Sequence, residues 1–136
     1  MDFLEYLDRP GVRTLTANGD TFWIYDPEHD LPPQRQMPFA TLVTSDAYDT
    51  ASNLDRPGVE RLNLGLPKAE YLKLFPTPPD DVDHAALDVV MPHPVYAPQY
   101  WICVLSPSVG TLRELEPLVD AAYEFAVRKY RNHKER

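Results

Sequence analysis

A tight reversal at Asn18-Gly19 restricts the fold of this chain more than any other local feature. Asparagine and glycine both tolerate the positive φ that a two-residue turn between antiparallel strands demands. The flanking residues 12–16 and 21–25 are rich in the β-branched and aromatic side chains that favour strands. The chain is therefore predicted to begin a β-sheet with an antiparallel hairpin.

The rest of the sequence alternates short strand-like and helix-like segments, joined mostly by short connections. Such an order favours an antiparallel sheet with flanking helices, which is an α+β fold. Further strands are predicted at residues 39–44, 59–64 and 100–105, and helices at residues 2–7, 46–53, 67–75 and 83–90. With the hairpin, these segments make a sheet of about five strands.

The C-terminal segment has the clearest helical pattern. Its apolar side chains recur at helical spacing, at Leu112, Leu115, Val119, Ala122, Ala126 and Tyr130. Thr111 and Glu114 have the spacing of a capping box. Pro117 conflicts with one unbroken helix, because an interior proline costs ~3 kcal/mol. We therefore expect a short turn and then a long helix from about Pro117, packed on one face of the sheet.

The hexapeptide Leu-Asp-Arg-Pro-Gly-Val occurs twice, at residues 7–12 and 54–59. Each copy follows a helix-like stretch and precedes a strand-like one. Proline ends a helix, and the Pro-Gly pair turns the chain. We interpret the repeat as one helix-to-strand connection used twice, because two copies do not build a repeat architecture.

The charge distribution separates a basic tail from an acidic body. The chain has 136 residues, the size of a single domain, and a net charge of −8. Residues 128–136 hold five basic side chains and one acid, which leaves eight basic and 20 acidic residues and a net charge of −12 elsewhere. Such a body repels phosphate backbones and anionic membranes. We predict one domain over residues 1–136 with a basic helical tail at 128–136, whose cations suit a helix C-terminus. Nucleic-acid binding is not expected, and the tail would be its only route.

The cysteine and histidine content argues against disulfides and metal ligation. Cys103 is the sole cysteine, and no two of the four histidines have metal-ligand spacing with each other or with Cys103. The N-terminus is acidic where a signal peptide is basic, and no apolar run reaches the roughly 18 residues of a membrane span. We therefore expect a cytoplasmic protein with no metal, no cofactor and no membrane partner.

Strand alternation predicts two different sheet faces. The two leucines of residues 59–64 point one way, and Arg61 and Asn63 point the other. With the long helix on the aliphatic face, the opposite face is expected to present Trp23, Tyr25, Arg61 and Asn63. Aromatic bodies beside fixed polar groups suit ligand binding. The alternative is that the aromatic rings only cover the sheet, while Arg61 stacks on them or pairs with a carboxylate.

His93 lies between two prolines, which restrict the backbone and pre-order its side chain. Tyr96 and Trp101 follow closely, and no acid is placed locally to orient the imidazole. Three interpretations stay open, namely a hydrogen bond that locks the loop, a ligand contact, and a general base. We hypothesise that His93 and Arg61 share a pocket.

Several motifs after the first hairpin match a known family in order. Phe-Ala-Thr-Leu-Val at 39–43, Arg-Leu-Asn-Leu-Gly-Leu at 61–66, a tryptophan-containing stretch at 92–101 and Leu-Val-Asp-Ala-Ala-Tyr at 118–123 resemble the MmcQ/YjbR-like proteins. This resemblance implies an antiparallel sheet with flanking helices and no established activity.

A second set of motifs resembles a bacterial domain family of unknown function even more closely. Its pattern contains Thr-Phe-Phe-x-Tyr-Asp-Pro, Asn-Leu-Asp-Arg-Pro-Gly-Val, Arg-Leu-Asn-x-Gly and His-Pro-Val-Tyr-Ala-Pro. These occur here at residues 21–27, 53–59, 61–65 and 93–98, with Trp23 in place of the middle phenylalanine.

The function that these features favour is a non-catalytic cytosolic module that binds a small molecule or a protein partner. Its candidate binding residues are Trp23, Tyr25, Arg61, Asn63, His93, Tyr96 and Trp101. One alternative is an enzyme in which His93 acts as acid or base while Arg61 binds an anion. The other is nucleic-acid binding through the basic tail.

Overall fold

The Asn18-Gly19 turn joins β1 (Val12–Ala17) to β2 (Asp20–Tyr25) in the computed structural model, which describes residues 3–134. The two strands pair antiparallel along their whole length. Asn18 and Gly19 have φ angles of 55° and 83°, which are the positive values of a two-residue hairpin turn. The predicted hairpin is therefore confirmed.

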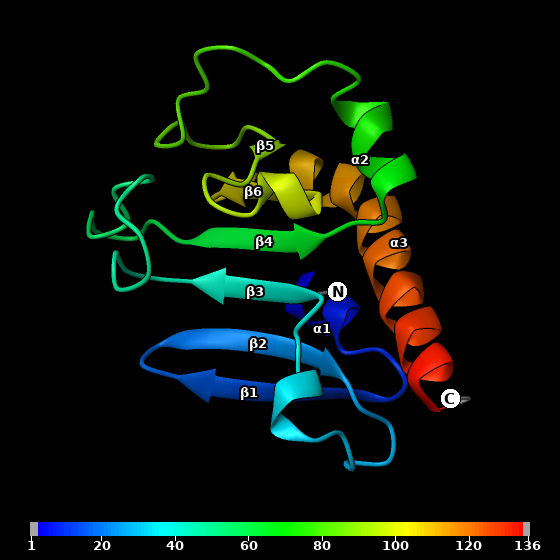
Figure 1. Cartoon of the computed structure of the whole chain (residues 1–136). Coiled ribbons are helices and arrows are strands. Elements are labelled where there is room, and N and C mark those ends of the chain that lie inside the picture. Colours follow the sequence, from blue (N-terminus) through cyan, green and yellow to red (C-terminus); the bar gives the residue numbers. More distant parts are fainter. Residues whose placement is uncertain (1–2, 135–136) are drawn as a thin grey trace.

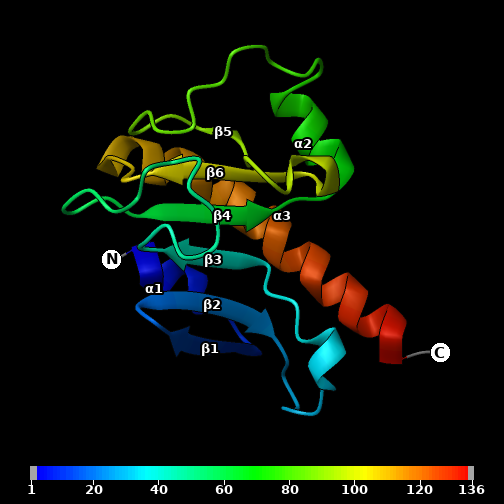
Figure 2. The same cartoon turned by 60° about the vertical axis from the view of Figure 1, so that its left-hand side comes forward.

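Six strands form one sheet in the order β1-β2-β3-β4-β6-β5, and every neighbouring pair is antiparallel (Figures 1 and 2). The other strands are β3 (Ala40–Val43), β4 (Arg61–Gly65), β5 (Met91–Pro92) and β6 (Trp101–Leu105). The predicted antiparallel α+β fold is confirmed. Strand β5 was not predicted, because a two-residue strand that ends in proline has no alternating pattern.

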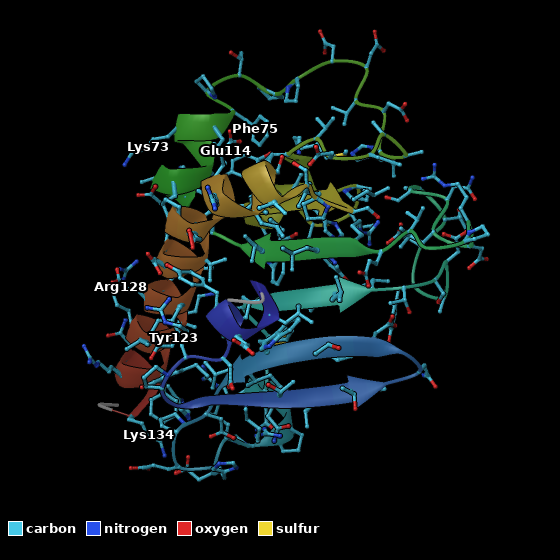
Figure 3. The ribbon with its side chains drawn as sticks, turned by 180° about the vertical axis from the view of Figure 1, so that it is seen from behind. Lys73, Phe75, Glu114, Tyr123, Arg128 and Lys134 are labelled. Atoms are coloured by element: carbon cyan, nitrogen blue, oxygen red, sulfur yellow. The ribbon has the colours of Figure 1, made fainter. Side chains whose placement is uncertain are left out.

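Two helices cover one face of the sheet, α1 (Phe3–Leu7) and α3 (Val109–Lys134) (Figure 3). The main core lies between them and the strands, and its buried residues include Leu7, Trp23, Leu62, Leu64, Ile102, Val104, Leu115, Val119 and Ala122. The helix α2 (Lys68–Leu74) follows Pro67 as predicted. Within residues 3–134, no helix combines the length and apolar character needed to cross a membrane.

A smaller core lies on the opposite face, beneath the loops that follow β3 and α2. It contains Val43, Leu54, Met91, Cys103 and Leu105. The Cys103 side chain is 1% exposed, and burial raises the pKa of its thiol to about 12. Cys103 is therefore a structural core residue.

The helix α3 is continuous through Pro117, so the predicted break there is wrong. The residues Leu115, Val119 and Ala122 are all fully buried, and their packing offsets the hydrogen bond that proline removes. The helix also begins earlier than predicted, because Ser108 is its cap. The Ser108 Oγ accepts the main-chain N–H of Thr111 at 3.2 Å.

Residues 46–53 and 83–90 form turns, so the two helices predicted there are wrong. Aspartate side chains bind nearby main-chain N–H groups in both segments. The Asp46 Oδ1 accepts from Leu54 at 2.8 Å, and the Asp83 Oδ1 accepts from Ala85 at 3.0 Å. Such bonds compete with helical ones and favour turns.

Both copies of the repeated hexapeptide form the same turn. The Val12 N–H donates to Arg9 O at 3.0 Å, and the Val59 N–H donates to Arg56 O at 3.3 Å. Each turn has proline then glycine at its centre, and the glycines have φ angles of 80° and 73°. The turn itself is shared, but the interpretation as a helix-to-strand connection holds only for the first copy, because residues 46–53 before the second copy form turns. The predicted first helix and basic tail extend to residues 1–2 and 135–136, which lie outside the described part.

Candidate functional site

A cavity of about 310 Å³ opens on the sheet face opposite α3, and we call it the sheet-face cavity. Most of its wall is aromatic or aliphatic, while its floor carries the polar side chains of β3 and β4. The residues that line it are Phe22, Met37, Pro38, Thr41, Val43, Tyr48, Asp49, Arg61, Asn63, His93, Tyr96 and Trp101. Its volume is at the small end of the ~300–1,000 Å³ that ligand pockets occupy.

The floor of the sheet-face cavity is a hydrogen-bond network around Arg61. Its guanidinium donates from Nη1 to Asp49 Oδ1 at 3.1 Å and from Nη2 to Asp49 Oδ2 at 2.8 Å. The Nη1 also donates to Ser52 Oγ at 3.0 Å, and the Nε donates to Asn63 Oδ1 at 3.0 Å. Asn63 then donates to Thr41 Oγ1 at 2.8 Å. Strand alternation places Arg61, Asn63 and Thr41 on the same face.

The charge of Arg61 is neutralised within the protein. Its side chain is 2% exposed and that of Asp49 is 16% exposed, so the pair is largely removed from water. The hydrogen bonds from Arg61 hold the pKa of the Asp49 carboxyl below its usual value. A bidentate ion pair of this kind leaves little net positive charge at Arg61 to attract an external anion.

His93 closes one end of the cavity and is 4% exposed. Its Nδ1 accepts the main-chain N–H groups of Val95 and Tyr96, both at 3.0 Å. Because Nδ1 is an acceptor, the proton of the neutral ring is on Nε2. Burial, aided by the nearby charge of Arg61, lowers the pKa of His93 to about 4. The imidazole is therefore a neutral hydrogen-bond donor at pH 7.

Trp101 forms the wall between the sheet-face cavity and a second cavity beside α3. Its partner across the strands is Gly65. A Cβ built on Gly65 would come within 2.8 Å of the Trp101 indole. Glycine is needed here because the indole lies directly against the β4 backbone.

Five of the predicted site residues line the sheet-face cavity, namely Arg61, Asn63, His93, Tyr96 and Trp101. Arg61 and His93 therefore line the same cavity, while their role in ligand binding stays a prediction. The hydrogen bonds of Nδ1 also match the interpretation of His93 as a loop lock.

The predicted position of Trp23 and Tyr25 is wrong. Trp23 is in the core beneath α3, and Tyr25 packs edge-on against Tyr123 and Tyr130 of that helix. The side chain from β2 that lines the sheet-face cavity is Phe22. Sequence reasoning also missed Asp49, because residues 46–53 were assigned to a helix.

The described residues include no group of three or more His, Cys, Asp or Glu side chains that could hold a metal ion. The polar groups of the cavity floor instead bind one another.

A family model covers almost the whole chain, matching residues 2–135. The chain belongs to DUF6194, a family of unknown function. No curated protein and no solved structure gives a significant match. The DUF6194 assignment agrees with the resemblance to a domain family of unknown function, and it brings no activity with it.

The size and lining of the sheet-face cavity in this DUF6194 protein suit a small molecule. The apolar walls can bury a compact hydrophobic body, and the His93 Nε2–H can donate to an acceptor. A general base needs a free lone pair, but Nδ1 is occupied and Nε2 carries the proton.

Proposed function

We propose that this protein is a non-catalytic binding module whose sheet-face cavity takes a small uncharged molecule. The molecule has an apolar, flat body that contacts Phe22, Tyr96 and Trp101. It also carries a hydrogen-bond acceptor, such as a carbonyl oxygen, that receives the His93 Nε2–H.

The observation that carries this proposal is the internal pairing of every charge at the cavity floor. Arg61 and Asp49 neutralise one another, and His93 is neutral. A charged ligand would lose its hydration without gaining a free partner. A neutral ligand loses little hydration and gains the apolar walls.

The enzymatic alternative has less support than binding. It requires His93 to exchange protons near neutral pH and Arg61 to hold an anion. A pKa of about 4 keeps His93 unprotonated at neutral pH, and Asp49 occupies the guanidinium.

The nucleic-acid alternative also has little support, because part of the basic tail is engaged. Lys134 pairs with Asp30 and with Glu28. A relationship to MmcQ/YjbR-like proteins and a cytoplasmic location stay predictions from the sequence.

Benzamide is a suitable probe of the proposal, because it is neutral, flat and carries a carbonyl acceptor. We expect it to shift the NMR amide signals of Asn63 and Tyr96 at concentrations up to about 10 mM, because a molecule of this size can bind with millimolar affinity. Toluene, which lacks the acceptor, should bind more weakly.

The variant His93→Asn gives the matched control. Its Oδ1 can replace Nδ1 as acceptor for the loop, while the Nε2–H is lost. Benzamide affinity should fall by roughly twofold to tenfold, with toluene affinity unchanged. Equal losses for both probes, or no shift in the cavity at about 10 mM benzamide, would overturn the proposal.

A further inference from the structure

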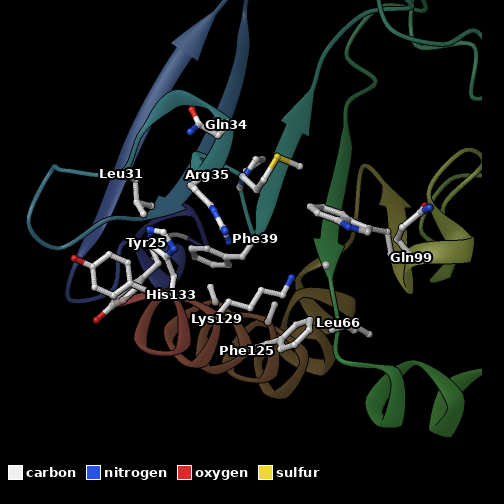
Figure 4. A pocket seen from close by; sticks show the side chains of 17 residues that line it. Tyr25, Leu31, Gln34, Arg35, Phe39, Leu66, Gln99, Phe125, Lys129 and His133 are labelled. Carbon is white, nitrogen blue, oxygen red and sulfur yellow. The ribbon is translucent and has the colours of Figure 1, made fainter. Parts of the chain in front are cut away.

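A second cavity, of about 320 Å³, lies between the C-terminal half of α3 and the short helix η1 (Pro33–Arg35) (Figure 4). We call it the helix-end cavity. Met37, Pro38 and Trp101 line both cavities and separate them. None of the sequence-based site predictions concerned this place, and only Tyr25 and Trp101 among the predicted residues line it.

The helix-end cavity is cationic although the protein is acidic overall. Arg35, Lys129 and His133 line it, and no aspartate or glutamate does. Figure 4 shows Arg35 reaching in from η1 and Lys129 from α3, so their nitrogen ends enter the same space from opposite sides. The whole protein has a net charge of −8. A cavity lined by basic side chains and no acid therefore differs sharply in charge from the average surface of this protein.

The acids near this cavity have other partners. Asp30 and Glu28 both pair with Lys134, and the hydrogen bond from Lys134 lowers the pKa of Asp30. The side chains of Arg35 and Lys129 form no ion pair within residues 3–134. Their positive charges are therefore available to an external anion.

Apolar side chains line the cavity beside the two cations, both of which are exposed. The Lys129 ammonium lies 4.0 Å from the centroid of the Phe125 ring, and partial burial of that ammonium lowers its pKa. Phe39 and Trp101 supply further aromatic wall. A bare inorganic ion would leave these rings exposed to water, whereas a ligand with a flat apolar part would cover them.

The loop that carries Arg35 is held in place by partly buried hydrogen bonds. Asp26, which is 1% exposed, accepts main-chain N–H groups of Asp30 at 3.1 Å and Leu31 at 3.3 Å. Gln36 donates from its side chain to Leu31 O at 2.8 Å. Arg35 therefore starts from an ordered backbone, which reduces the entropy lost on binding.

We infer that the helix-end cavity binds a small organic anion, a carboxylate or a phosphate monoester carried on a flat apolar body. The planar guanidinium of Arg35 receives the two oxygens side by side, and the Lys129 ammonium adds a second charge from across the cavity. This site is separate from the proposed neutral-ligand site and does not depend on it.

Benzoate and phenyl phosphate test the inference, with benzamide as the neutral match to benzoate. At least one anion should shift the NMR amide signals of Leu31 and Ala126 at concentrations up to about 10 mM. Stronger binding of phenyl phosphate would identify the anion as a phosphate, and stronger binding of benzoate would identify it as a carboxylate. Benzamide should not shift these signals.

Two double variants with the same change of net charge complete the experiment. Arg35→Gln with Lys129→Gln should weaken anion binding by roughly tenfold or more, because both charge-assisted contacts are lost. Lys68→Gln with Arg113→Gln removes two exposed cations that do not line the cavity, and should leave binding unchanged. Equal losses in the two double variants, or no shift by either anion at about 10 mM, would overturn the inference.

Discussion

The Arg61 guanidinium and the Asp49 carboxylate meet through two parallel hydrogen bonds, of 3.1 Å and 2.8 Å. The pair ties strand β4 to the loop that follows β3, and it does so beneath the sheet-face cavity. It also explains why Arg61 is tolerated at 2% exposure, since a buried guanidinium needs a nearby anion. Asp26, another buried acid, instead binds Arg13 at 3.1 Å.

The first prediction is that Asp49→Asn destabilises the protein by ~3 kcal/mol, because it leaves the buried charge of Arg61 without compensation. Urea unfolding at pH 7 measures this change. The exposed pair Lys73–Glu70 is the control, and Glu70→Gln should change stability by less than about 0.5 kcal/mol. Similar small losses in both variants would contradict a structural role for the buried pair.

The second prediction concerns pH. The pKa of His93 is about 4 in the folded protein and 6.5 in an ordinary environment, so the unfolded chain binds the extra proton between these values. The stability that His93 contributes is complete above pH 6.5 and is lost as pH falls toward 4. Between pH 7 and pH 5 the loss should be about 2 kcal/mol.

Replacing His93 by Asn isolates that effect, because the loop keeps an acceptor while the titrating ring is removed. Between pH 7 and pH 5, the free energy of unfolding in urea should fall by about 2 kcal/mol less for His93→Asn than for the wild type. Parallel pH profiles for the wild type and His93→Asn would show that His93 is not the group responsible.

The third prediction uses the repeated turn. Gly11 and Gly58 have similar positive φ angles, but a Cβ on Gly11 would lie 2.6 Å from the Tyr25 ring, while one on Gly58 would meet nothing within 4 Å. Gly58→Ala should therefore cost only the backbone strain of about 1 kcal/mol. Gly11→Ala should cost at least about 1 kcal/mol more, because Tyr25 is held between Tyr123 and Tyr130. Thermal or urea unfolding of the two variants measures the difference, and equal losses would contradict this account.

Local sequence patterns predicted the fold best where the connections are short, as between β1 and β2, between β4 and α2, and between β6 and α3. The Asn18-Gly19 turn and the alternation around Arg61 are both readable from neighbouring residues. The prolines that flank His93 are also its neighbours in the sequence, so a local pattern was enough to select a residue that lines the sheet-face cavity.

The features that local patterns did not predict depend on pairing between segments that are distant in the sequence. Both faces of β2 are rich in apolar and aromatic residues, so alternation alone does not say which face meets the helix. The register that aligns Phe22 with Thr41 and Thr41 with Asn63 places Phe22, rather than Trp23, on the cavity side. Asp49 reaches Arg61 from a loop twelve positions away, and Lys129 lies far along the chain from Arg35.

The last prediction concerns the wall that both cavities share. Gly65→Ala places a methyl group 2.8 Å from the Trp101 indole, so the ring must move. The variant should lose about 1–3 kcal/mol of stability, which is the usual cost of overpacking. Tryptophan emission should shift to longer wavelength, because displacement exposes Trp101 while Trp23 stays 3% exposed in the core.

Gly110→Ala is the matched control, since the nearest atom to its new Cβ is 4.0 Å away and alanine favours the helix. It should keep the wild-type emission and be as stable as the wild type or more so. Benzamide and benzoate should both bind more weakly to Gly65→Ala, because Trp101 lines both cavities. If emission and binding in Gly65→Ala match those of the wild type, Trp101 is not the rigid wall between the cavities.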